Sequence, residues 1–220
     1  MNILSIDFDW IMEPTINSYN NFSHPQENWT FNTWRDIKFE IPEGNFSFNP
    51  DKYYQLLNII INFRLNCKDL DYIYTGLDHH FILDAMKFWN INKEESILLC
   101  NIDHHHDCGY IDKGEQYLES IEKQNPSLAN WVYYFCKEYN TTQYLWIKND
   151  NSMWPPDNME LSNSPLFIPS SDIASIRKIN FDRLFICLSP DWVPPKYYPM
   201  YNVIEDIIRL RPKIDNLNKK

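Results

Sequence analysis

The densest group of metal-binding side chains in the sequence is the run Asp103-His104-His105-His106-Asp107, which directly follows an apolar stretch. Two carboxylates and three imidazoles side by side are costly to bury unless a cation compensates them. In an extended backbone alternate side chains share a face, so Asp103, His105 and Asp107 are expected to point one way and His104 and His106 elsewhere. The run predicts a metal site.

Two other apolar runs end in side chains of the same kind. Asp7 and Asp9 close the first run, and their spacing places both carboxylates on one side of an extended strand. His79 follows the second run. Together with the first group, these residues offer four carboxylates and two imidazoles, enough for two ions that share ligands.

The ligand types indicate which metal and which reaction to expect. An oxygen-rich set with some imidazole and no thiolate favours Mn²⁺ over structural zinc, with Mg²⁺ and Fe²⁺ as weaker alternatives. Two such ions about 3.5 to 4 Å apart ionise a shared water at neutral pH. The predicted reaction class is metal-assisted hydrolysis.

Five short, almost continuously apolar runs are expected to form the strands that position these residues. They cover residues 3–8, 72–75, 97–102, 144–147 and 184–188. Such runs are typical of strands covered on both faces, as in a parallel sheet. Between them, helical patterns cover residues 49–61, 78–89, 127–139 and 200–211. The alternation predicts an α/β fold with three layers, α/β/α, and a mainly parallel sheet, whose ligands bind at the carboxyl ends of the strands.

Two segments, 10–48 and 149–170, are long for simple connections. They are interpreted either as lids or substrate walls or as surface decoration, with neither favoured. The sequence has 220 residues and shows no internal repeat and no linker between domains. A single domain over residues 1–220 is therefore expected.

The composition narrows the functional classes. With 20 basic and 30 acidic residues the net charge is −10, which argues against nucleic-acid binding. This charge suits a cationic substrate, although solubility alone also explains it. The sequence shows neither a signal peptide nor an apolar run approaching the about 20 residues that span a bilayer. A cytoplasmic protein without membrane contact is expected, with its five scattered cysteines reduced and with Cys100 and Cys187 in the core.

Four segments of the chain resemble the arginase and agmatinase family. Asp103-x-His105-x-Asp107 resembles its DxHxD signature, Gly76-Leu77-Asp78-His79 its GGDH segment, and Ser5-Ile6-Asp7-Phe8-Asp9 its S-x-D-x-D strand. The segment 185–195, FICLSPDWVPP, is similar to one in small arginase-like proteins that include the peptide arginases. Those enzymes convert arginine residues of ribosomally made peptides to ornithine.

The resemblance implies an arginase-like domain that holds two manganese ions and releases urea from a guanidinium group. It implies that one ion is bound by His79, Asp103, Asp107 and Asp7, and the other by His105, Asp103, Asp7 and Asp9. Asp107 is also implied to pass a proton to the departing amine.

The chain departs from ordinary arginases in three ways. Its DxD strand precedes the other motifs, and the last acid of the usual D-x-D-x-x-D-P pattern becomes Glu13-Pro14, displaced by one residue. The chain is also shorter and has no match to loops that grip a free amino acid. These departures put the pairing of ligands in question and favour an arginine-containing peptide, reached through an open cleft, as the substrate.

Further residues are candidates for substrate binding and proton transfer. Asp191 and Glu13 are predicted to bind substrate, Asp191 by accepting a guanidinium hydrogen bond, with a turn or helix cap as the equal alternative. Trp154 is predicted to line the pocket by stacking on the guanidinium, against the competing and favoured interpretation that it packs in the core. His106 is predicted to act in catalysis as a proton shuttle, with His80 and His104 as alternatives; a supporting role behind the ligands is the competing interpretation.

Other functional classes stay open at this point. Asp103-His104-His105 also matches the signature of DHH phosphoesterases, although a net charge of −10 would repel phosphate esters. A deacetylase of arginase-like fold would need one zinc and would leave Asp7 and Asp9 without a task. A module that binds a basic peptide or stores metal, without catalysis, is the third alternative.

Overall fold

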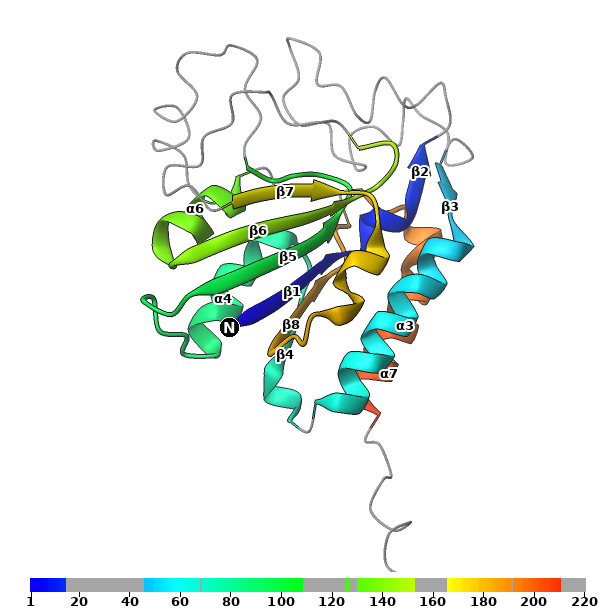
Figure 1. Ribbon diagram of the computed structural model, residues 1–220. Coiled ribbons are helices and arrows are strands. Elements are labelled where there is room, and N and C mark those ends of the chain that lie inside the picture. Colours follow the sequence, from blue (N-terminus) through cyan, green and yellow to red (C-terminus); the bar gives the residue numbers. More distant parts are fainter. Residues whose placement is uncertain are drawn as a thin grey trace, which may run out of the picture.

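The computed structural model describes residues 1–14, 46–67, 69–108, 126, 130–152, 166–190 and 192–210. Six strands in these ranges form one sheet in the order β4-β8-β1-β5-β6-β7, and every strand pair in it is parallel (Figure 1). The strands are β1 (Asn2–Asp7), β4 (Ile73–Gly76), β5 (Ile97–Asp103), β6 (Thr141–Lys148), β7 (Leu166–Ser170) and β8 (Arg183–Cys187). A separate antiparallel pair joins β2 (Met12–Pro14) to β3 (Phe46–Phe48).

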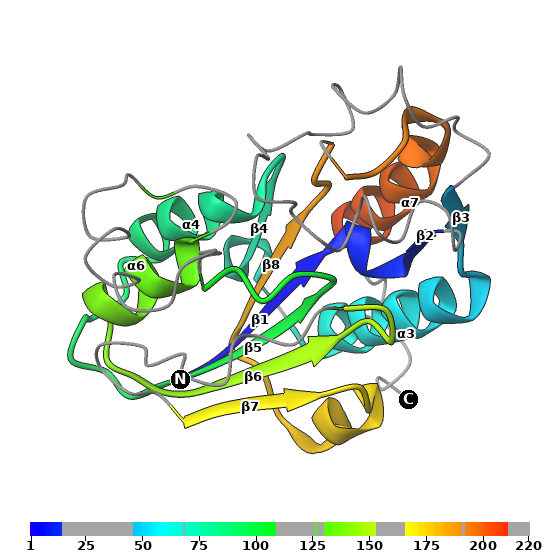
Figure 2. The same ribbon diagram turned by 90° about the horizontal axis from the view of Figure 1, so that it is seen from above.

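Helices cover both faces of the sheet, which confirms the three-layer α/β/α prediction. Figure 2 shows α4 (Ile82–Phe88) and α6 (Trp131–Glu138) on one side and α3 (Pro50–Asn66) and α7 (Tyr198–Arg209) on the other. The 3₁₀ helix η6 (Ile173–Lys178) lies on the same face as α3. Each face has its own apolar core.

The apolar runs arise because alternate residues of each strand belong to different cores. On β1, Leu4 and Ile6 pack toward α3 and α7, whereas Ile3 packs toward α4 and α6. On β5, Ile102 and Leu99 divide in the same way. Since neither face meets water, neither face needs polar residues, and the strands appear in the sequence as continuous hydrophobic runs.

All five predicted strands are confirmed, and the differences from prediction have local causes. β7 lies in a segment predicted to be irregular, because it is an edge strand that contains Pro169. The helix predicted over 78–89 is divided into the 3₁₀ turn η4 (His79–Phe81) and α4. α3 is capped by Asn49 as predicted but continues to Asn66.

The expected extended backbone at the two acidic motifs is wrong. β1 ends at Asp7, and Asp9 belongs to the 3₁₀ helix η1 (Phe8–Ile11), whose first turn is capped by Asp7. β5 ends at Asp103, and Asp107 adopts a left-handed conformation with φ of 49°. Turns, and not strand alternation, therefore aim these side chains. Among the described helices, none is long and apolar enough to cross a bilayer.

Candidate metal centre

The predicted ligands meet at the carboxyl edge of the sheet. Asp7 ends β1 and Asp103 ends β5, and these two strands are neighbours in the sheet. His79 follows β4, on the other side of β8. At the end of β4 the backbone lies close to the side chains of Phe185 and Phe81. Glycine fits at position 76, because a Cβ there would lie 3.1 Å from both. The motif order in the sequence is therefore compatible with one site, since β1 lies in the middle of the sheet.

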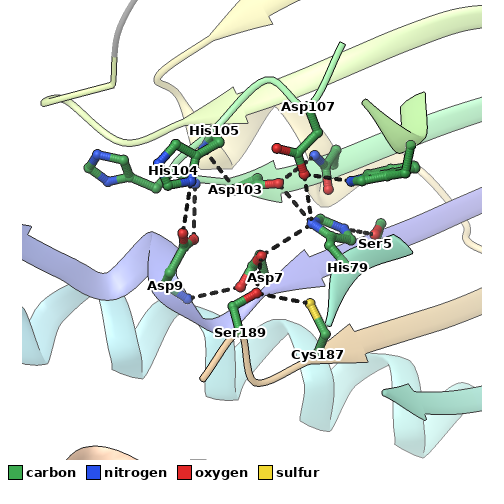
Figure 3. A network of polar contacts seen from close by, with 12 residues as sticks. Ser5, Asp7, Asp9, His79, Asp103, His104, His105, Asp107, Cys187 and Ser189 are labelled. Atoms are coloured by element: carbon green, nitrogen blue, oxygen red, sulfur yellow. Dashed lines mark hydrogen bonds and ion pairs between the residues drawn. The ribbon is translucent and has the colours of Figure 1, made fainter. Parts of the chain in front are cut away.

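Three carboxylates surround one nitrogen of His79 (Figure 3). Its Nδ1 lies 2.8 Å from Asp103 Oδ2, 3.3 Å from Asp7 Oδ2 and 3.3 Å from Asp107 Oδ2. All four side chains are buried. An octahedral ion with metal–ligand distances of about 2.1 Å places neighbouring ligand atoms about 3.0 Å apart. The spacing of His79, Asp103 and Asp107 therefore fits one metal shell, and Asp7 belongs to a neighbouring group with His79 and Cys187.

A second group lies directly beside the first and shares Asp103 with it. His105 Nδ1 lies 3.0 Å from Asp9 Oδ2, and these two residues with Asp103 bring three ligand atoms together. The backbone N–H of Asp9 donates to Asp7 Oδ1 at 3.2 Å, which joins the two groups again. The arrangement offers two adjacent groups of potential ligand atoms that share one carboxylate, that of Asp103.

Hydrogen bonds from outside the two groups fix the orientation of the ligands. Ser5 Oγ lies 2.6 Å from His79 Nε2, which leaves Nδ1 facing the carboxylates. The His79 ring also lies between Trp131 and Phe185, with centroid distances of 4.4 and 5.8 Å. Trp131 Nε1 donates to Asp107 Oδ2. Such outer contacts preorganise ligands and tune metal affinity.

The other two carboxylates of the first group are held in the same way. Ser189 Oγ donates to Asp7 Oδ2, and Asn101 Nδ2 donates to Asp103 Oδ2 at 3.0 Å. Ser189 has a φ of 50° and, with Asp107, is one of three residues other than glycine with positive φ in the described ranges. Two of the three thus touch the candidate centre, where backbone strain commonly has a functional purpose.

Ser189→Ala is expected to weaken Mn²⁺ binding by about 10- to 100-fold, because Asp7 loses the donor that orients it. Calorimetric titration of the metal-free protein with MnCl₂ measures this affinity. Ser171→Ala, at an exposed serine, is the matched control and should bind as the unchanged protein does. Equal affinity in both variants would show that the Ser189 contact does not act on a metal site.

Without a cation, the cluster must hold protons. Burial raises the pKa of Asp9 well above its ordinary value, and the charges of Asp7 and Asp103 add to the effect. Burial and Asp103 likewise raise the pKa of Asp107 to about 7.

The pKa values of the two imidazoles, those of His79 and His105, are also raised, but the cause is different. Burial acts to lower the pKa of His79, but Asp103 and the other carboxylates outweigh it and raise the pKa well above 6.5. Burial also opposes charge on His105, yet Asp9 raises its pKa to about 9. Without metal, the carboxylates and imidazoles of the site therefore share protons among them, and a divalent cation would replace these protons.

His106 and His104 lie beside the centre in packed positions. His106 Nδ1 accepts from the backbone N–H of Cys108 at 3.2 Å, and its ring meets the edge of Trp146. Burial and the nearby His105 lower the pKa of His106 to about 3, so its ring is neutral. The backbone N–H of His104 donates to Asp9 Oδ1 at 3.3 Å. These are supporting contacts, and the catalytic role of His106 stays a prediction.

The predicted substrate residues are only partly placed. Asp191 and Trp154 lie outside the described residues. Glu13 Oε1 accepts from Asn49 Nδ2 at 2.6 Å and pairs with Lys52 Nζ at 3.4 Å, so this oxygen is engaged at the start of α3. A contact between Glu13 and substrate stays a prediction.

The structure adds residues that the sequence did not assign to the site. Cys187, predicted as a core residue, is buried, but its thiol also lies in a group of potential ligand atoms with Asp7 and His79. Burial and Asp7 raise its pKa well above the ordinary value, so Sγ keeps its proton. The sequence signal that could have identified Cys187 is its position at the end of a strand, where it is the partner of Asp7 in the sheet. Trp131 had no such signal, because its contact depends on how α6 packs.

Comparison of the chain with protein-family models, with curated proteins and with solved structures found no match. What is established is an α/β protein with a six-stranded parallel sheet and buried groups of His, Asp and Cys that could hold metal ions.

Proposed function

We propose that this protein is a dinuclear metal-dependent hydrolase that converts arginine residues of a peptide to ornithine and urea. The observation that carries the proposal is the pair of adjacent ligand groups that share Asp103. A single structural ion would not require a second buried carboxylate–imidazole pair. The motifs that resemble the arginase family contribute all six of the ligands.

The donor set fits two manganese ions. His79, Asp7, Asp103 and Asp107 would hold one ion, and His105, Asp9, Asp103 and Asp7 the other. Carboxylate and imidazole ligands at octahedral spacing suit Mn²⁺, and the one thiol in reach, that of Cys187, keeps its proton. When bound, two such ions supply an ionised water at neutral pH.

The chain's own residues would orient the substrate and move the proton. Water adds to the guanidinium carbon, the bond from that carbon to the side-chain nitrogen breaks, and urea leaves. The departing nitrogen needs a proton, and Asp107 would carry it on Oδ1, since Oδ2 accepts from Trp131 Nε1. A carboxylate is a common group for such proton transfer.

The charge of the chain and its departures from arginases favour a cationic group on a larger molecule. The net charge of −10 favours a cationic substrate. The absence of sequence matches to loops that grip free arginine supports a peptide as substrate. Asp191, Glu13 and Trp154 stay the proposed contacts to that peptide.

The direct test is mass spectrometry of arginine-containing peptides incubated with the full chain and MnCl₂. We expect conversion of arginine to ornithine with one urea released for each residue converted. Lysine in place of arginine should give no product, and free arginine and agmatine should react far more slowly. Equal turnover of free arginine would contradict the peptide specificity, and no urea from any of these compounds would overturn the proposed reaction.

A further inference from the structure

The outward face of α3 is unusual because it carries amides instead of charges. Between Tyr53 and Asn66 the only charged side chain is Arg64, and it is buried. Asn58, Asn62 and Asn66 are exposed and follow one another every four residues. Residues at this spacing lie in a row along one side of a helix. We call these three residues the amide row.

The amide row borders a cavity of about 1240 Å³ that is lined by residues of α3 and η6. Figure 1 shows these two elements on the same face of the sheet. Ile59, Phe63 and Phe181 are among its apolar lining residues. This volume exceeds the roughly 300 to 1,000 Å³ that suits a small molecule. Its lining follows α3 from Gln55 to Asn66, so an elongated ligand fits this groove better than a compact one does.

The repeat of the amide row matches an extended peptide. Side chains four residues apart on a helix are separated by about 6 Å along its axis. In an extended chain, main-chain groups on the same side repeat about every 6.6 to 6.8 Å. An amide side chain both donates and accepts hydrogen bonds, so a row of them can pair with the N–H and C=O groups of one edge of a peptide. Asn66 Nδ2 already donates to the carbonyl of Asn62 at 2.9 Å, so Asn58 and Asn62 are the main contacts. The apolar lining would take up side chains of the same peptide.

Two carboxylates and two guanidinium groups lie at the rim of the cavity. Asp69 Oδ1 accepts from the N–H of Asp71, and Asp182 Oδ2 from that of Asn2, so each carboxylate has a backbone partner. Arg183 lies 4.1 Å from the centre of the Tyr72 ring, and its Nη1 donates to the carbonyl of Asp182 at 2.8 Å. Arg177 is exposed beside it, and this pair of guanidinium groups is where a carboxylate of the peptide would bind.

We propose that this groove binds an extended peptide segment, with its main chain along the amide row and an acidic side chain at Arg177 and Arg183. The groove involves the amino ends of β4 and β8, whereas the metal centre lies at the carboxyl edge. An arginine held at the metal centre and an acid held by Arg177 and Arg183 would orient one peptide across both. In taking this peptide as the substrate, the inference rests on the proposed function.

The test measures binding without turnover. The full chain, in buffer with EDTA, is immobilised and offered a synthetic library of randomised peptides that contain one fixed arginine. We expect the retained peptides to be enriched in Asp and Glu relative to the input. Arg177→Glu should abolish the enrichment. No retention above the bare matrix, or retention without acidic enrichment, would overturn the proposal.

Variants in the amide row test main-chain recognition. Asn58→Leu with Asn62→Leu is expected to lower affinity for a retained peptide by about tenfold or more, since two or more hydrogen bonds are lost. Asn58→Ser with Asn62→Ser should have a similar effect on a surface that stays polar. The matched control is Asn202→Leu, at an exposed asparagine on α7, which should leave affinity unchanged. Unchanged affinity in the first two variants would contradict the inference.

N-methylated peptides give the sharpest readout, because successive N–H groups of an extended chain point to opposite edges. Methylation of alternate nitrogens in one register should reduce affinity about tenfold, whereas the other register should bind as before. If methylation in either register lowers affinity equally, the proposal that the groove recognises one edge of an extended peptide is overturned. If peptides bind in this way but no arginine is converted, the groove is supported and the hydrolase is rejected. If arginine is converted but binding does not depend on the methylated register, the hydrolase is supported and the groove is rejected.

Discussion

Asp103→Asn is expected to abolish turnover and to prevent the binding of both metal ions. Asp103 is the residue that the two ligand groups share, and its Oδ2 lies 2.8 Å from His79 Nδ1. Loss of even an outer hydrogen bond lowers metal affinity or activity by about 10- to 100-fold, so the loss of a shared ligand should cost more than about 100-fold. Elemental analysis and urea release measure the two effects.

The fold should survive this substitution. An asparagine oxygen can still accept from the N–H of His105, which donates to Asp103 Oδ1 at 2.8 Å. The matched control is Asp84→Asn, at an exposed carboxylate on α4 that pairs with Lys87. Circular dichroism should show the same secondary structure for both variants.

A second substitution keeps the test decisive if Asp103→Asn does not fold. Asp9→Asn removes a carboxylate that the metal-free protein holds at a raised pKa, so it should fold well and yet lose the second ion. Two bound ions and full turnover in a folded Asp103→Asn or Asp9→Asn protein would reject the dinuclear assignment. A single zinc per chain in the unchanged protein would favour the deacetylase interpretation.

The sheet was predictable because its strands are covered on both faces. β1 and β5 contribute alternate residues to two separate cores, which produces continuous apolar runs whose short length is typical of strands and not of helices. β7 was not predictable, since it is an edge strand of half-exposed residues interrupted by Pro169. β2 and β3 have three residues each, too few for a periodic pattern.

The site was predictable in its residues and not in its geometry. Asp7 and Asp103 could be placed at one edge because parallel strands end together. Asp9 and Asp107 reach the same point through a 3₁₀ turn and a left-handed residue, which no alternation rule contains. The contact from Trp131 to Asp107 depends on the packing of α6 against the sheet, a tertiary event without a local signal.

Stabilisation of the protein by manganese is expected to increase with pH, because the metal-free site holds protons that the ion must displace. Burial acts to lower the pKa of His105, yet Asp9 and Asp103 raise it to about 9. Burial and the charge of Asp103 raise the pKa of Asp107 to about 7. Near neutral pH, His105 is therefore protonated and Asp107 is partly so.

A folded-state pKa above the ordinary value also fixes how the metal-free protein responds to pH. Between 3.8 and about 7 for Asp107, and between 6.5 and about 9 for His105, the folded chain binds more protons than the unfolded chain. The stability of the metal-free protein should therefore be fully present below these windows and fall as pH rises through them. Metal affinity should change in the opposite direction, since ligands bind in their deprotonated forms.

Thermal unfolding with EDTA or with excess MnCl₂, from about pH 5.5 to about pH 8.5, measures the difference between these two opposing trends. We expect the gain in Tm on adding MnCl₂ to be small at the acid end and to widen steadily toward the alkaline end. Asp84→Asn should reproduce this widening, whereas Asp9→Asn, which lacks the partner that raises the pKa of His105, should flatten it. A gain in Tm that stays constant or shrinks as pH rises would mean that manganese does not displace the protons of this cluster, and the ion would then have to bind elsewhere.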